Sequence, residues 1–241
     1  MPSTATKGFV LLDVFVPEIL QYVQGCPTIM ARTHIRNSII LFCERSRILK
    51  RDPSSFFLTE DVHTYTLKYS GDRYVAIASK EVQIGEGTTG KKLTETTEHE
   101  LDNSVINWRS MEGAEPNSYF LTDEINQIRF FEIPNQDSDD EVYVRTIVKP
   151  RRNVTEVDEF LWEKWEETIQ AGALSSLLMM PGSSWFNGQL SNQFSQEFKR
   201  GVRRARATSI SGTTEKPLQV VPRSYEVFGS GSFNRRITSW D

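Results

Sequence analysis

Two helix-forming stripes separated by a single Pro-Gly pair constrain the fold of this chain most. Apolar or small side chains recur every four residues across 161–177 and every three or four residues across 190–205. Both spacings follow one face of an α-helix. Pro181 cannot continue a helical hydrogen-bond ladder, and it disfavours the helical conformation of the residue before it. The stretch therefore predicts a helical hairpin whose turn spans about 181–187.

The first predicted helix carries the small residues Ala171-Gly172-Ala173 in its middle. These side chains cannot hold a second helix away, so we expect close backbone approach there. Trp162 and Trp165 lie one turn apart and cannot both point deep into one narrow seam. One of them is therefore expected to face a different element.

Two more helices are predicted near the N-terminus. Residues 11–23 indicate a short helix that starts near Pro17, and Gly25-Cys26-Pro27 breaks it. Pro27 suits the first turn of the next helix, where a missing backbone donor costs nothing. That helix is expected to reach Arg47 or Leu49. Its predicted buried side is formed by Ile35, Ile39, Phe42 and Cys43.

The periodicity changes after Asp52-Pro53. Short runs of β-branched and aromatic residues alternate with turn-forming residues, a spacing typical of an antiparallel sandwich or a barrel-like sheet. These runs are 56–59, 64–67, 74–77, 82–84, 119–121, 128–133 and 142–148.

The helices at the two ends of the chain must meet in space to bury their stripes. We therefore predict an α+β fold with a discontinuous helical bundle from both chain ends, a β-rich insert and an extended C-terminal arm. The expected segments are N-terminal helices at 1–50, the insert at 51–154, a helical hairpin at 155–208 and the arm at 209–241.

Composition narrows the class of protein. A chain of 241 residues, 38% of them hydrophobic, can bury a substantial core. The apolar run 9–16 is interrupted by Asp13 and lacks a basic leader and a cleavage site, so we expect neither a signal peptide nor a membrane span. Cys26 and Cys43 form no disulfide framework and have no metal-ligand spacing, which favours folding in a reducing cytoplasm.

The net charge of −4 conceals an asymmetry between the body and the C-terminal region. Residues 199–241 hold nine Lys or Arg against three acids, so residues 1–198 carry a net charge of −10. Basic residues gather at the predicted end of the second hairpin helix, where they either contact nucleic-acid phosphates or favour the helix dipole and cover a solvated face. This basic helix end comprises Lys199, Arg200, Arg203, Arg204 and Arg206.

Several apparent chemical motifs lack the context that their chemistry needs. Residues 85–90 match G-x-G-x-x-G, but β-like residues follow them, whereas a nucleotide-binding loop must open a helix. The acidic run 137–141 lacks the glycine and the final glutamate of a calcium loop. His34, His63 and His99 have no metal-site spacing, and no nucleophile motif is present. We expect no enzyme activity and no catalytic, cofactor-binding or metal-binding residues.

Two blocks of the sequence carry a family resemblance. Gly25-Cys26-Pro27, followed by a helix that ends in Phe42-Cys43-Glu44-Arg45-Ser46, resembles the opening of the tailed-bacteriophage head–tail adaptor family. A later block is similar to the closing helical hairpin of that family. It comprises Trp165 through Ile169, Gly172-Ala173, Leu177, Met180, Pro181, Trp185, Asn187, Leu190, Phe194, Phe198 and Ala205. The resemblance covers the two helical ends only, and its motifs are structural rather than catalytic.

The resemblance implies a structural virion protein that is made in the host cytoplasm and resides at the head–tail junction. Members form a homo-oligomeric ring, usually of twelve copies, which joins the portal protein to a tail or nozzle protein. The ring leaves a channel through which DNA passes, and no membrane is involved. An acidic body suits a channel wall, because fixed negative charge repels phosphate.

In several members of the family an extended C-terminal segment clamps the portal, and this chain has a candidate for such an arm. Its large apolar groups are too many for a solvated tail, so we expect the arm to order on a neighbouring molecule. The expected contact residues are Tyr225, Phe228, Phe233, Arg235, Arg236, Ile237 and Trp240. The alternatives are a stopper or tail-completion protein of the same connector, and a nucleic-acid-binding protein that uses the basic helix. The acidic remainder and the lack of a nucleic-acid-reading motif argue against the second.

Overall fold

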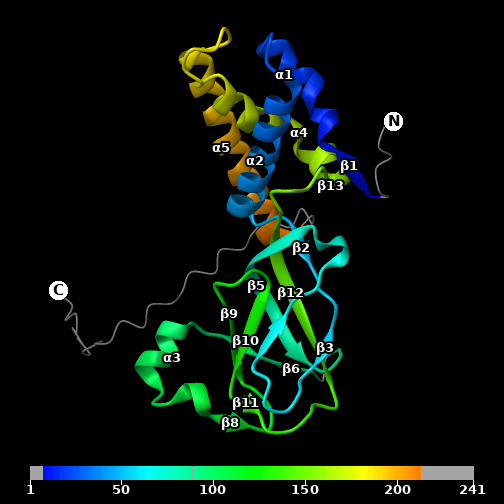
Figure 1. Cartoon of the computed structure of the whole chain (residues 1–241), viewed down its shortest axis with the longest axis vertical. Helices are drawn as coiled ribbons and strands as arrows, with labels where there is room; N and C mark the ends of the chain where they lie inside the picture. Colours follow the sequence, from blue (N-terminus) through cyan, green and yellow to red (C-terminus); the bar gives the residue numbers. More distant parts are fainter. Residues whose placement is uncertain (1–7, 88–89, 213–241) are drawn as a thin grey trace, which may run out of the picture.

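The computed structural model describes residues 8–87 and 90–212 (Figure 1). It is an α+β protein, as the sequence predicts, with most helices gathered at one end and the larger sheets at the other. The α-helices are α1 (Val16–Tyr22), α2 (Thr28–Ser46), α3 (Glu98–Ser104), α4 (Glu159–Leu177) and α5 (Gly188–Ser211). Short 3-10 helices occur at η1 (Leu12–Phe15), η2 (Ser70–Asp72) and η3 (Trp108–Ser110).

The strands of the described residues form four sheets. The largest runs β2-β12-β5-β6 with β3 also on β12, the second runs β4-β10-β9-β7, and two pairs, β1-β13 and β11-β8, complete the set. The strands are β1 (Phe9–Leu11), β2 (Lys50–Arg51), β3 (Phe56–Phe57), β4 (Thr64–Thr66), β5 (Tyr74–Ile84), β6 (Lys91–Lys92), β7 (Thr94–Glu95), β8 (Glu112–Gly113), β9 (Ser118–Leu121), β10 (Gln127–Phe131), β11 (Ile133–Pro134), β12 (Glu141–Pro150) and β13 (Glu156–Asp158).

The predicted helical hairpin is formed by α4 and α5. The first helix ends at Leu177, before Pro181, and Asn187 caps the second by accepting a hydrogen bond from the Leu190 backbone at 3.0 Å. The close approach expected in the middle of α4 is confirmed at Gly172. A Cβ atom there would lie 2.7 Å from Phe198 Cδ2, and closer still to Ser38 Oγ.

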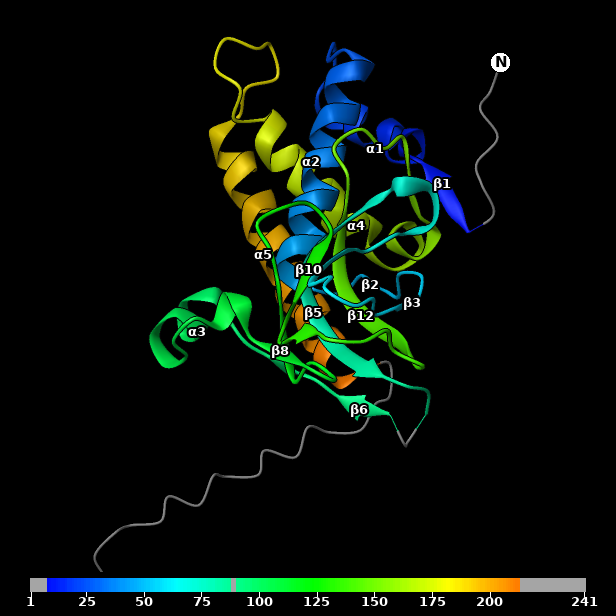
Figure 2. The same cartoon turned by 60° about the horizontal axis from the view of Figure 1, so that its bottom comes forward.

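Helix α2 packs into this hairpin, as Figure 2 shows. Its predicted buried stripe is confirmed, and the Phe42 ring lies 5.4 Å from that of Trp165. Trp165 is buried, whereas Trp162 is partly buried at the margin of the same cluster. That single hydrophobic cluster combines side chains of α1, α2, α4 and α5, so the stripes at the two ends of the chain bury one another. Pro27 lies just before α2 as its N-cap rather than in its first turn.

The two larger sheets share a second hydrophobic cluster. Three details of the predicted strands were wrong. Runs 74–77 and 82–84 belong to one strand, β5, because its pairing with β12 continues through two register shifts across the polar residues between them. Run 128–133 is two strands, separated at Glu132, whose φ is +68°. The sheets are not wholly antiparallel, because β7-β9 and β8-β11 are parallel pairs.

Helix α3, which was not predicted from the sequence, stands out to one side of the sheets in Figure 1. The segment at 85–90 connects β5 and β6, which pair as an antiparallel hairpin with Ile84 opposite Lys91. This confirms that the glycine motif opens no helix. The predicted arm residues, Tyr225, Phe228, Phe233, Arg235, Arg236, Ile237 and Trp240, lie outside the described residues.

Candidate functional site on helix α5

The five basic residues predicted as a site all lie on α5, and all five are exposed. They were expected at a helix end, but the helix continues past Arg206 to Ser211 and has no basic residue in its last turn. The dipole effect is confined to the terminal turn of a helix. Stabilisation of the helix C-terminus therefore does not account for these cations.

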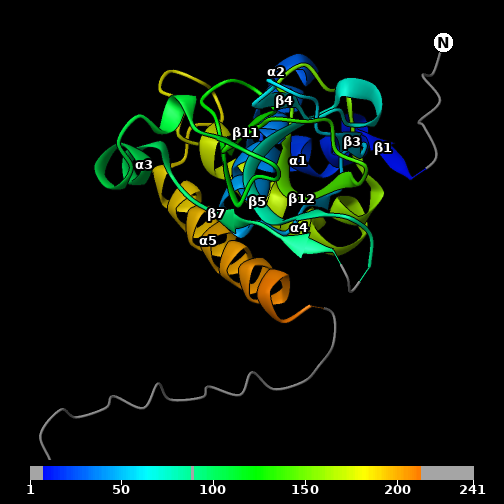
Figure 3. The same ribbon diagram turned by 90° about the horizontal axis from the view of Figure 1, so that it is seen from below.

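The spacing of the five cations divides them between two sides of α5. Arg200 and Arg204 face α4, whereas Lys199, Arg203 and Arg206 face the end of α2. This follows from the 3.6-residue period, which places residues three or four positions apart on one side. Figure 3, the view from below, shows α5 running along the edge of the molecule.

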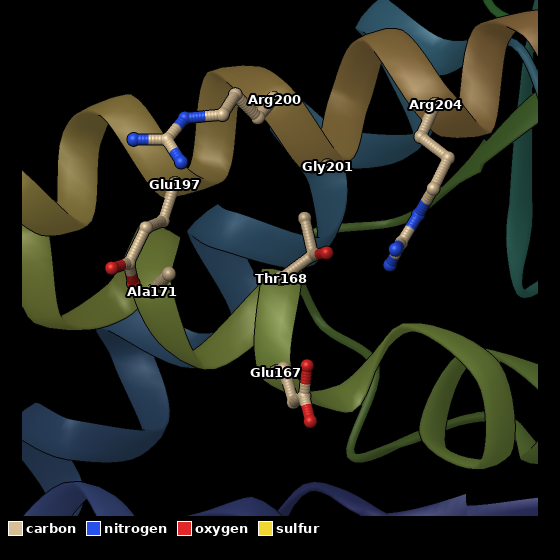
Figure 4. Close-up of a pocket in the computed structure, with 7 residues that line it drawn as sticks. All are labelled: Glu167, Thr168, Ala171, Glu197, Arg200, Gly201 and Arg204. Atoms are coloured by element: carbon tan, nitrogen blue, oxygen red, sulfur yellow. The ribbon is translucent and has the colours of Figure 1, made fainter.

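The first side is a cleft of about 370 Å³ between α4 and α5 (Figure 4). Gly201 lies at the close approach, since a Cβ atom there would lie 2.8 Å from Thr168 Cβ. Glu167 and Glu197 share the cleft with Arg200 and Arg204, so its charge is balanced. The cleft therefore does not select a strongly charged ligand of either sign.

Arg204 also has a packing role. Its guanidinium lies 5.4 Å from the centre of the Trp165 ring, the distance of a cation–π contact. Trp165 belongs to the main hydrophobic cluster. Arg204 thus covers the rim of the core as well as contributing charge.

The second side is a groove of about 380 Å³ between α5 and the end of α2. We call it the basic groove. Its lining residues are Glu44, Arg45, Arg47, Lys199, Val202, Arg203 and Arg206. The sequence did not indicate that Arg45 and Arg47 lie beside α5. No local signal joins these positions, because the groove is created by tertiary packing.

The basic groove is strongly positive. Glu44, its one carboxylate, pairs with Lys149 at 3.2 Å, so it does not neutralise the groove. Within the described residues none of the five cations of the groove takes part in an ion pair with a carboxylate. Unpaired cations converging in one concave place create a field that attracts an anionic partner.

Two hydrogen bonds fix the shape of the basic groove. Ser209 Oγ donates to the Arg47 carbonyl at 2.6 Å, and Lys50 Nζ donates to the Ser209 carbonyl at 2.6 Å. Arg47 has φ +54° in the left-handed region and ends α2, so the chain turns there toward β2. The last turns of α5 are thereby held against the junction of α2 and β2.

The remaining candidates provide no assembled chemical centre. Asp137 accepts a hydrogen bond from the Glu60 backbone at 2.8 Å, a structural role in the acidic loop. Cys26 and Cys43 are buried free thiols, and burial raises the pKa of Cys43 to about 12. Among residues 8–87 and 90–212 no group of three or more His, Cys, Asp or Glu side chains is placed to hold a metal ion. No helix in that part of the chain is long and apolar enough to cross a membrane.

Comparison with models of known protein families gives no match, and comparison with curated protein sequences gives none either. What the structure defines is therefore an α+β protein whose distinguishing surface is the basic groove beside α5.

Proposed function

We propose that this chain is a structural virion protein, a head–tail adaptor that forms a ring between the portal and the tail. The observation that supports this best is the union of the two resembling sequence blocks. They lie far apart in the chain, yet Phe42 and Cys43 of the first block share one hydrophobic cluster with Trp165 and Phe198 of the second. The resemblance therefore concerns one three-dimensional unit rather than two unrelated helices.

In this proposal the scaffold is the helical unit formed by α1, α2, α4 and α5, and the β-rich residues 51–154 are an insert. The arm was expected to begin at residue 209, but α5 continues to Ser211, so we assign the arm to residues 213–241. The ring has twelve copies, the portal binds on one side and a tail or nozzle protein on the other, and DNA passes through the centre. The chain acts through its surfaces and not as an enzyme.

Exposed apolar side chains at the free end of the helical unit add support. Tyr22, Ile29, Met179 and Phe186 are 52%, 75%, 52% and 53% exposed. They belong to the end of α1, the start of α2 and the turn between α4 and α5. Apolar groups gathered at one end of a molecule are typical of a contact surface. An assembly subunit needs such a surface, whereas a free monomer does not.

Removal of the arm tests the proposal. A chain that stops after Gly212 should keep its helical circular dichroism, since every described helix lies before that point. It should lose co-purification with the portal protein encoded in the same genome, because the portal contacts are assigned to residues 213–241. Full retention of portal binding by the shortened chain would contradict the role given to the arm, and the absence of portal binding by the intact chain would contradict the adaptor function.

A further inference from the structure

The basic groove has a counterpart of opposite charge on the same helical unit. The cations that α5 contributes, Lys199, Arg203 and Arg206, are spaced i, i+4 and i+7, and we call them the basic stripe. Helix α4 presents a second set at the same spacing, which we call the acidic stripe. It consists of Glu159, Glu163 and Glu166. Each stripe is about 10 Å long at the helical rise of 1.5 Å per residue.

The acidic stripe is as poorly neutralised as the basic groove. None of its three carboxylates takes part in an ion pair within the described residues. The neighbouring cations are Lys164 and Arg51, and Arg51 pairs with Asp158 instead. Partial burial raises the pKa of Glu166, and the carboxylates of Glu18, Glu167 and Glu163 raise it further. The carboxylates of the acidic stripe therefore repel one another, and a cationic surface on another molecule would reduce this repulsion.

The two stripes lie at overlapping heights along the axis of the helical unit, but they face different sides of it. Helices α4 and α5 are antiparallel: Ser191 Oγ donates to the Ser175 carbonyl near the turn, and Gly201 meets Thr168 further along. The second half of α5 is thus beside the first half of α4. The basic stripe faces the end of α2, whereas Glu166 is close enough to Glu18 of α1 for the two charges to interact.

We propose that the basic groove of one copy receives the acidic stripe of a second copy, forming the head-to-tail contact of a ring. The inference rests on the proposed ring, because a closed ring needs two different patches on each subunit, related by a rotation. The basic stripe and the acidic stripe meet that requirement. Their residues have the same spacing, the two stripes have the same length and opposite charge, and they lie at overlapping heights along the helical unit. Double-stranded DNA is the competing occupant of the groove, but the body of the chain is acidic and repels phosphate.

Charge reversal tests the contact in the full-length chain. In sedimentation velocity at low salt, wild type should self-associate, and the association should weaken as salt rises because the charges are screened. Lys199→Glu with Arg203→Glu, and separately Glu163→Lys with Glu166→Lys, should each weaken self-association by about a hundredfold or more, since each juxtaposes like charges. Lys68→Glu with Arg152→Glu makes the same change in net charge as the first variant at exposed positions outside both stripes, and it should associate as wild type does.

Mixing the two reversed variants gives the decisive result. Each reversed face then meets a complementary face on the other variant, so the mixture should regain association while each variant alone stays monomeric. Circular dichroism should be unchanged in all variants. A mixture that stays monomeric, or a wild type that is monomeric at every salt and protein concentration, would overturn the contact.

The same proteins, titrated against a labelled 30-base-pair duplex, decide between a second copy and DNA. Tight duplex binding that is lost in Lys199→Glu with Arg203→Glu would assign the groove to nucleic acid and overturn the proposal. Portal binding is measured in a separate experiment, so that experiment tests the adaptor function independently of the contact between the stripes. Conversely, self-association through the stripes survives if the chain proves to bind no portal.

Discussion

Close packing of the three long helices depends on single residues that lack a side chain. Gly172 lets α4 meet both Ser38 of α2 and Phe198 of α5, and Gly201 lets α5 meet Thr168 of α4. The small run around Gly172 is visible in the sequence, and the close approach predicted from it is confirmed. The role of Gly201 was not predicted, because a lone glycine in a basic helix gives no sign of what lies opposite it.

Gly172→Ala should lower the free energy of unfolding by about 1 to 3 kcal/mol, the usual cost of overpacking a core. The new methyl group would overlap Phe198, whose Cδ2 lies 2.7 Å from the Cβ position. Urea denaturation followed by circular dichroism measures the change. Gly188→Ala is the matched control, since its Cβ would meet only Phe186, at 3.9 Å. Alanine is the better helix former, so helix propensity alone would stabilise both variants. A Gly172→Ala protein as stable as wild type, or more stable, would contradict close packing at position 172.

At the scale of elements, the long amphipathic helices were predictable and the short elements were not. The stripes of α2, α4 and α5 carry their period over many turns, so their existence and buried faces follow from sequence. Helix α3 begins with a capping box in which Thr97 and Glu100 exchange hydrogen bonds, a signal present in the sequence but hidden behind the β-like residues before it. The basic groove was predicted only in part. The cations of α5 are close together in the sequence and were identified there, whereas Arg47 joins them only through tertiary packing.

One buried carboxylate links the helical unit to the large sheet. Asp158, only 3% exposed at the start of α4, accepts a hydrogen bond from the Tyr74 hydroxyl of β5 at 3.0 Å and pairs with Arg51 of β2. A buried charge needs such partners, because an unsatisfied one is costly. The three side chains therefore hold elements from both ends of the molecule together.

Tyr74→Phe should lower the free energy of unfolding by about 2 kcal/mol, the scale of a hydrogen bond to a charged group. The ring and its packing remain, so the loss reports the hydroxyl alone. Thermal and urea unfolding would measure it. Tyr22→Phe, at a 52% exposed ring, is the matched control and should change little. If the two substitutions have the same small effect, Asp158 does not depend on Tyr74 for its stability.

At the scale of the whole molecule, the features on which the proposed assembly rests all lie on the helical unit. Helices α1 and α2 share one hydrophobic cluster with α4 and α5, apolar groups are exposed at one end of this helical unit, and opposite charges lie on different sides of it. The sequence could indicate the α+β class and the union of the ends. The sequence could not show that the basic stripe and the acidic stripe lie at overlapping heights along the helical unit, because this depends on how α4 and α5 are aligned.

The most direct test of the proposed adaptor is a reconstruction by electron microscopy of the head–tail junction in particles of the virus that, on this proposal, encodes the chain. We predict a ring of copies between portal and tail, with the helical unit of each copy contacting the next and residues 213–241 reaching the portal. Particles whose junction is complete without this chain would contradict the account.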